Sequence, residues 1–231
     1  MKKLCAILLM CMVSGIVMAD FAVTPYVAGD FNGWDAGANP MIDNSDGTYS
    51  LSITGLEGGQ RQEFKITDGT WASNYPGPNS WYYADASGNI TITFNTNVVS
   101  DGWQPEQYRL GLSTDPGTWT VAGDFNGWNN ADPATAMASL GGGIYMYSQT
   151  LTAGTYYFKP VVTGTGTWDS ISIDGRSVGT ANMSVTTTPG LEVVNIYVDA
   201  LNGTVKTEIV PEPTTMLLLG LGSLLAIRRK K

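Results

Sequence analysis

The chain has 231 residues with no histidine and two cysteines, and its 20 acidic residues outnumber its 12 Lys and Arg residues. The lack of histidine excludes Ser-His catalytic triads, Cys-His pairs and most zinc sites. Residues 1–19 and 210–231 together hold six basic residues and only one acidic residue. Residues 20–209 therefore carry 6 basic and 19 acidic side chains. This balance argues against nucleic acid and anionic lipid as partners and is compatible with a neutral polysaccharide.

The first 19 residues have the organisation of a secretory signal peptide. Lys2 and Lys3 precede an apolar run, and the small residue Ala19 stands at the expected cleavage point. This order is typical of an exported protein whose leader is removed. Cys5 and Cys11 both lie inside the leader, so we expect the mature chain to fold without disulfides.

An eight-residue stretch, Val-Ala-Gly-Asp-Phe-Asn-Gly-Trp, occurs twice, at 27–34 and 121–128. The offset of 121 − 27 = 94 residues is the size of one small domain and predicts two tandem domains of the same fold. Its Gly, Asp and Asn residues favour a turn, which would carry Trp34 or Trp128 just past a strand end. Two interpretations stay open for each Trp: it plugs the end of the fold, or it contacts a partner.

Between the two ends, short alternating runs bounded by turn residues predict strands throughout. Tyr49, Leu51 and Ile53, for example, alternate with Ser and Thr. Each copy has room for about seven such strands, which is typical of an immunoglobulin-like sandwich. We therefore predict an all-β fold with two tandem immunoglobulin-like (early-set) β-sandwiches, at residues 20–104 and 105–209, joined by a short linker.

The C-terminal end, residues 210–231, combines a Pro-Glu-Pro triplet, a short apolar run that predicts a helix, and a basic end. Its marker residues are Pro211, Glu212, Pro213, Arg228 and Arg229, followed by two lysines. A run of this length is short for a spanning helix, and the basic block would hold that end on the cytoplasmic side. This order resembles the PEP-CTERM sorting signal of Gram-negative bacteria. The resemblance implies export, transient inner-membrane anchoring through the tail, processing by an exosortase-type enzyme, and delivery to the cell surface or extracellular matrix.

In each copy the repeat is followed by a Gly-x-Tyr strand, a Phe-Lys pair, a Trp, and Asn near a late strand. This order resembles the glycogen-binding module, of the carbohydrate-binding module 48 type, found in the regulatory subunit of AMP-activated kinase and beside starch-debranching domains. The resemblance implies sugar-binding roles for eight residues: Trp34, Lys65, Trp71 and Asn89 in the first copy, and Trp128, Lys159, Trp168 and Asn195 in the second. Indole rings stack on the apolar faces of glucose units, and Lys and Asn bind their hydroxyls.

The two copies differ around these positions. Lys65 and Trp71 are six residues apart, whereas Lys159 and Trp168 are nine apart, and Pro160 directly follows Lys159. A further aromatic run, residues 81–83, either extends a sugar platform or packs under the preceding Pro-rich loop.

We therefore expect an exported, non-catalytic protein that binds an α-glucan or another exopolysaccharide, with no cofactor and no metal. The alternative is a structural or adhesive surface protein that uses the sandwiches as scaffolds without binding sugar. No acidic pair stands in a recognisable glycosidase motif, so we do not expect an enzyme.

Overall fold

The computed structural model describes residue 21 and residues 24–179 and 181–211. This part of the chain consists of strands and turns with three single 3-10 turns, and the all-β prediction is confirmed. The predicted signal peptide (1–19) and the tail beyond Pro211 lie outside the described residues. Within the described residues, no helix has the length and apolar character needed to cross a membrane.

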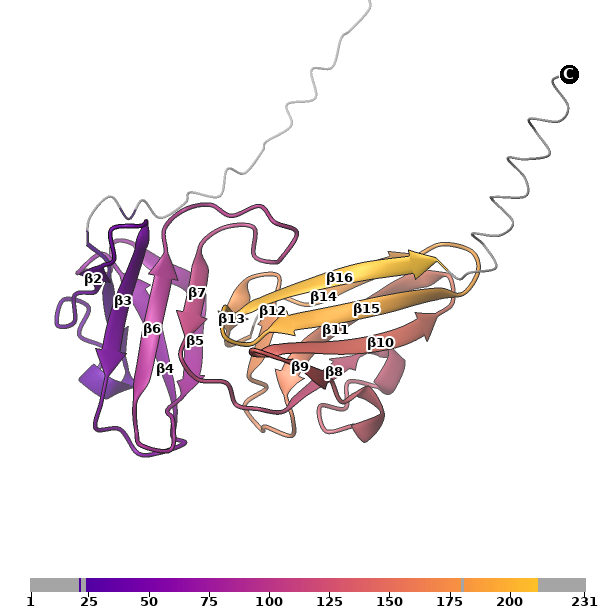
Figure 1. Cartoon of the computed structure of the whole chain (residues 1–231), viewed down its shortest axis with the longest axis horizontal. Coiled ribbons are helices and arrows are strands. Elements are labelled where there is room, and N and C mark those ends of the chain that lie inside the picture. Colours follow the sequence, from indigo (N-terminus) through magenta and orange to yellow (C-terminus); the bar gives the residue numbers. More distant parts are fainter. Residues whose placement is uncertain (1–20, 22–23, 180, 212–231) are drawn as a thin grey trace, which may run out of the picture.

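The first half of the described chain forms two antiparallel sheets, here called sheets A and B and together the N-terminal unit (Figure 1). Sheet A has the strand order β1–β4–β5, and sheet B has the order β2–β3–β6–β7. The strands are β1 (Tyr26–Gly29), β2 (Ile42–Asp43), β3 (Thr48–Ile53), β4 (Arg61–Thr67), β5 (Asn74–Tyr83), β6 (Ile90–Asn95) and β7 (Arg109–Leu112).

The second half forms two further sheets, C and D, which together are the C-terminal unit (Figure 1). Sheet C has the order β16–β15–β10–β9, and sheet D has the order β13–β12–β11–β14, with β8 also paired to β11. The strands are β8 (Trp119–Gly123), β9 (Ala138–Gly141), β10 (Ile144–Leu151), β11 (Gly154–Val162), β12 (Ser170–Ser172), β13 (Gly175–Ser177), β14 (Met183–Thr187), β15 (Glu192–Asp199) and β16 (Thr204–Pro211).

In each unit the two sheets share one apolar cluster. Phe64 of sheet A meets Ile92 and Phe94 of sheet B in the N-terminal unit, and all three side chains are fully buried. Phe158 of sheet D and Ile196 of sheet C occupy the equivalent interior of the C-terminal unit. Burial of each such side chain contributes about 1.5–3 kcal/mol. Because strand residues alternate between faces, polar neighbours of these residues lie on the outer faces of the sheets.

The strand pairing places the boundary between the two units later in the chain than the predicted division after residue 104. β7 pairs with β6, so residues through Leu112 belong to sheet B. The predicted linker is also held in place, because Gln104 and Val205 exchange two backbone hydrogen bonds with N–O distances of 2.7 and 3.0 Å. The Pro-rich stretch 74–79, predicted as a loop, is the first part of β5. A turn beginning at Ser113 therefore connects the two units.

Candidate functional site

The repeated stretch forms the same loop in both units. Asp30–Asn32 and Asp124–Asn126 each make one 3-10 turn, η1 and η2. Gly33 and Gly127 follow these turns in the left-handed region, at φ values of 65° and 63°. This conformation favours glycine because it has no Cβ. The third such turn, η3 (Pro133–Thr135), has no counterpart in the first copy.

Side chains of the repeat hold the loop closed, which explains why their identity is retained in both copies. Asn32 accepts a hydrogen bond from the Gly29 amide at 3.0 Å and donates to the Val27 carbonyl at 3.2 Å. Gly29 also packs tightly, because a Cβ there would stand 2.5 Å from the Glu63 carbonyl oxygen. The second copy repeats both hydrogen bonds and the close approach. The repeat is thus a structural motif that presents its final residue.

That final residue is a tryptophan held in a strained and fixed conformation. Trp34 and Trp128 have φ values of 66° and 61°, which cost a non-glycine residue about 1–2 kcal/mol. Each indole Nε1 donates to an aspartate of its own loop, Asp30 at 3.0 Å and Asp124 at 3.1 Å. Phe31 packs against the N-terminal core, whereas neither tryptophan belongs to a core cluster. Backbone strain of this kind concentrates at ligand sites.

In the N-terminal unit the loop places two tryptophans together. The ring centroids of Trp34 and Trp71 are 6.4 Å apart, and the ring planes are inclined by 32°. Trp71 lies in the turn between β4 and β5, and 47% of its surface is exposed. Two indole rings at this spacing form an apolar surface with open faces, of the kind that sugars contact.

Lys65 lies on β4 and points away from the core, because its neighbours Phe64 and Ile66 are fully buried. Its Nζ donates to the Asn74 side chain at 2.9 Å and also to the Gly77 carbonyl. An ammonium group has three donors, so a third stays available for a ligand oxygen. Partial burial lowers the pKa of Lys65 below its usual value. Lys65 therefore lies on the outer face of sheet A, near the end of β4 from which the turn with Trp71 continues, and we call Trp34, Trp71 and Lys65 the tryptophan surface.

In the C-terminal unit the equivalent residues are present, but the two tryptophan rings are not in contact. Trp168 has a φ of 55° and 39% of its surface is exposed. No ring contact joins it to Trp128 among the described residues. Lys159 occupies on β11 the position that Lys65 holds on β4, and burial lowers its pKa in spite of the opposing charge of Asp174. The extra residues before Trp168 thus separate the rings that lie together in the first copy.

The two predicted asparagines lie on other sheets. Asn89 stands in the turn before β6 of sheet B, where its backbone N–H donates to the Asp85 carboxylate at 2.8 Å. Asn195 lies on β15 of sheet C and accepts from Ser148 at 2.5 Å. Since the neighbours of Asn195 face the core, its side chain is on the outer face of sheet C, across the unit from Lys159. Neither asparagine joins the tryptophan surface.

The other end of the outer face of sheet A is covered by the C-terminal unit. Glu63 on β4 pairs with Trp81 on β5, so Trp81 shares the outer face with Glu63. Trp81 is nevertheless fully buried and belongs to the apolar cluster of the C-terminal unit. Its Nε1 donates to the Ser170 carbonyl at 3.3 Å, and the Arg176 guanidinium lies 4.8 Å from its ring centroid. Trp81 is therefore packed, but against the C-terminal unit and not under the Pro-rich stretch that precedes it.

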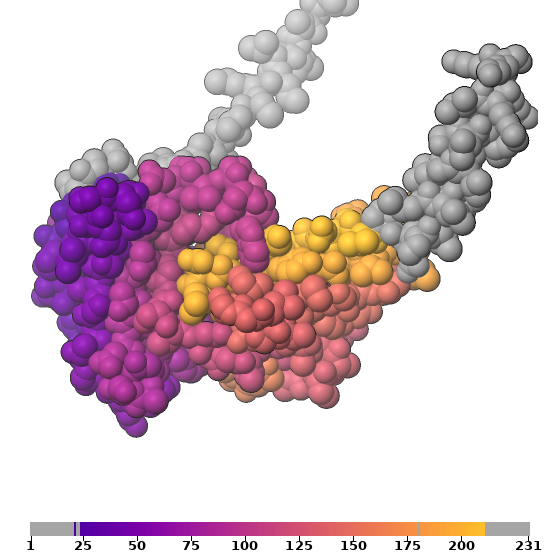
Figure 2. All heavy atoms as spheres, in the orientation of Figure 1, coloured from indigo at the N-terminus to yellow at the C-terminus, as the bar shows by residue number. Residues whose placement is uncertain are grey.

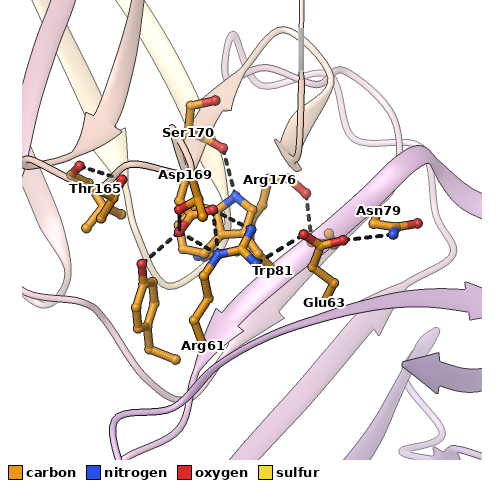
Figure 3. A network of polar contacts seen from close by, with 12 residues as sticks. Arg61, Glu63, Asn79, Trp81, Thr165, Asp169, Ser170 and Arg176 are labelled. Atoms are coloured by element: carbon orange, nitrogen blue, oxygen red, sulfur yellow. Dashed lines mark hydrogen bonds and ion pairs between the residues drawn. The ribbon is translucent and has the colours of Figure 1, made fainter. Parts of the chain in front are cut away.

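A buried ion pair closes this contact between the units (Figure 3). Arg61 donates to the Asp169 carboxylate from Nε at 2.8 Å and from Nη2 at 2.6 Å. Tyr83 and Thr167 donate hydroxyl bonds to the same carboxylate at 2.7 and 2.8 Å. Asp169 is completely buried, while Arg61 keeps 21% of its side-chain surface exposed and also bonds Glu63 at 3.0 Å. The Asp169 carboxylate thus joins the two units, beside the burial of Trp81 and the backbone hydrogen bonds between Gln104 and Val205.

The hydrogen bonds around Asp169 outweigh its burial. Burial raises the pKa of this carboxyl, but the hydrogen bonds from Arg61, Tyr83 and Thr167 together lower the pKa by more than burial raises it. The pKa of Asp169 therefore lies below its usual range. Burial lowers the pKa of the Arg176 guanidinium to about 10. Sequence analysis did not single out Arg61, Asp169 or Arg176, because partners 108 residues apart leave no local pattern.

Comparison with known proteins gives two family matches. Residues 114–204 match the family model of the pullulanase X25 domain. Residues 210–231 match the PEP-CTERM protein-sorting motif, which confirms the predicted sorting signal and indicates an exported protein. The first match begins just after β7, in agreement with the unit boundary drawn from strand pairing.

Among solved structures, the chain is similar to the pullulanase from Bacillus acidopullulyticus, with 14% identity and a TM-score of 0.29. The similarity covers 82% of this chain but 29% of that one. No curated protein matches the chain.

Proposed function

We propose that this chain is an exported, non-catalytic carbohydrate-binding protein whose ligand is an α-glucan such as glycogen or starch. The tryptophan surface of the N-terminal unit would be its principal binding site. The chain would reach the cell surface or matrix after exosortase-type processing of its tail. Both units would be immunoglobulin-like sandwiches of the glycogen-binding type, in keeping with the shared core between two sheets in each.

The observation that carries the proposal is the pairing of Trp34 with the exposed Trp71. Trp34 is partly exposed, sits in a strained loop, bonds Asp30 and belongs to no core cluster, so packing alone does not explain why it recurs in the repeat. Its open face suits the apolar face of a glucose unit, and the free donor of Lys65 suits a hydroxyl. Rigid aromatic side chains favour binding because little conformational entropy is lost.

The second copy would contribute a weaker contact through Trp128, Lys159 and Trp168. The ion pair at Asp169 fixes the orientation of the two units, so a polymer long enough to reach both would gain affinity from their linkage. An oligosaccharide too short to reach both copies would bind the tryptophan surface without this gain in affinity.

Affinity electrophoresis of the full chain in native gels tests the proposal. Retardation in gels with glycogen or amylopectin, and normal mobility with hydroxyethylcellulose, is the expected result. Trp71→Ala should lose the retardation, while Trp168→Ala, a matched exposed tryptophan of the second copy, should keep most of it. Equal mobility of the wild-type chain in every gel would refute α-glucan binding.

The buried contact between the units also favours the structural or adhesive alternative. Trp81 and the Arg61–Asp169 pair make the two units one rigid body, as a spacer requires. The same gels separate the two functions, because a spacer is not retarded.

A further inference from the structure

A cleft of about 470 Å³ lies where the two units meet, away from the tryptophan surface. This volume falls in the range of about 300–1,000 Å³ that is typical of small-molecule sites. Both units line it, which is a common location for ligand sites. In Figure 2 the yellow C-terminal strands end against the magenta strands of the N-terminal unit, and the surface is hollowed where they meet.

One wall of the cleft is the outer face of sheet B. The side chains of Thr91, Thr93 and Asn95 line it, because the alternate residues of β6 point into the core. Gly111 of β7 lies beside Thr93 and leaves room above the sheet. This wall therefore offers a row of hydroxyl and amide groups that donate as well as accept.

The opposite wall is the turn between β15 and β16. Asp199, Asn202 and Thr204 supply its polar groups, and Leu201 supplies an apolar one. The Leu112 amide donates to the Leu201 carbonyl at 2.7 Å, which holds this wall against sheet B. The cleft is thus a preformed feature of the contact between the units.

Arg109 gives the cleft a buried donor. Its Nη2 donates to Asp101 at 2.8 Å and to the Trp103 carbonyl at 3.1 Å. Its Nη1 is also buried, and no acceptor for it exists among the described residues. A buried guanidinium donor without a partner is costly, which favours a small movement of the Arg109 side chain that brings Nη1 to a ligand oxygen in the cleft.

The charge of the lining selects among ligand classes. Arg109 contributes one positive charge, while Asp101 and Asp199 contribute two negative charges. A phosphate or a uronate would therefore meet net repulsion. The remaining groups are hydroxyls, amides and the apolar side chains of Leu112 and Leu201, which suit a ligand that is neutral, rich in hydroxyls and partly apolar.

We infer that this cleft is a second ligand site, which binds a short neutral saccharide. The ligand class, a saccharide, is the same as in the proposed function, but the cleft contains none of the residues of the tryptophan surface. Arg109 donates to a sugar oxygen, the row of Thr93 and Asn95 contacts hydroxyl groups, and Leu201 covers an apolar face of the ring.

The test uses the full chain and the indole N–H signal of Trp103, which lines the cleft. Maltose, cellobiose and diacetylchitobiose are titrated one by one, with glucuronate as the anionic probe. We expect at least one disaccharide, but not glucuronate, to shift the Trp103 signal with saturation. No shift with any disaccharide, or tighter binding of glucuronate, would overturn the inference.

A cleft-filling variant gives the control. A Cβ at Gly111 meets Thr93 at 3.5 Å and Asn202 at 3.8 Å, which are ordinary contacts, so Gly111→Leu extends into the cleft without backbone strain. It should weaken the Trp103 response at least tenfold, and Trp71→Ala should leave that response unchanged. Thr93→Leu fills the cleft from the other strand if Gly111→Leu does not fold. A Trp103 response that survives in a folded filling variant would contradict the assignment, whatever happens at the tryptophan surface.

Discussion

Replacement of Arg61 by methionine tests whether the ion pair at Asp169 stabilises the contact between the units. Methionine keeps much of the side-chain length but removes the guanidinium donors to the Asp169 carboxylate, which is 0% exposed. Loss of one partner of a buried pair costs about 3–5 kcal/mol. Tyr83 and Thr167 still bond Asp169 in the variant, and Arg61 itself is partly exposed, so the lower end applies. We expect a loss of about 3 kcal/mol, on the order of a hundredfold in the unfolding equilibrium.

Urea unfolding followed by tryptophan fluorescence measures this change. Asp101→Asn serves as the control, because Asp101 pairs with Arg109 but keeps 48% of its side-chain surface exposed. Such an exposed pair contributes about 0–1 kcal/mol. If Arg61→Met changes the free energy of unfolding no more than Asp101→Asn does, the pair does not stabilise the contact and the reasoning is refuted.

Three further predictions follow from the same geometry. The folded-state pKa of Asp169 is lowered, so the stability that its charge contributes is present above its ordinary pKa of about 3.9 and is lost as the pH falls through the folded value. Without Arg61, burial raises that pKa, so the loss of unfolding free energy caused by Arg61→Met, measured in urea, should shrink between pH 7 and pH 4. A loss that stays constant over this range would contradict the prediction. Gly29→Ala should lower stability by about 1–3 kcal/mol in thermal unfolding, because its Cβ meets the Glu63 carbonyl at 2.5 Å, whereas Gly166→Ala, with open space around it, should be close to neutral. Trp71→Ala should weaken α-glucan binding by about 2 kcal/mol, roughly thirtyfold, in calorimetry with maltoheptaose, with little change in thermal stability; an unchanged affinity would remove Trp71 from the site.

Local patterns predicted the strands well because they depend on neighbouring residues. The alternation through Tyr49, Leu51 and Ile53 corresponds to β3, and the repeat at 27–34 forms a strand followed by a turn, as its glycines require. The Pro-rich stretch 74–79 was predicted as a loop but is part of β5, where Asn74 and Tyr75 pair with β4 and the Pro and Gly residues fall at a shift in register.

Contacts between residues far apart in the chain leave no local sequence pattern, and they were not predicted. Trp81 looks like an exposed aromatic of the first copy until the C-terminal unit covers it. Asp169 looks like any acidic residue until Arg61 reaches it. The order of motifs placed Asn195 after Lys159 and Trp168, but order does not specify the sheet or the face on which a side chain lies. The structure accordingly brings Trp34 and Trp71 together but leaves Asn89 and Asn195 on other sheets.

The most direct test of the account observes all seven tryptophans of the chain at once. Their indole N–H signals are resolved by 15N–1H correlation spectroscopy, assigned by single Trp→Phe replacements, and followed during titration with maltoheptaose. We expect saturable shifts of the Trp34 and Trp71 signals, while the signals of the buried Trp81 and Trp119 stay in place. Signals of Trp34 and Trp71 that do not move at saturating maltoheptaose would contradict the central claim that these two rings bind α-glucan.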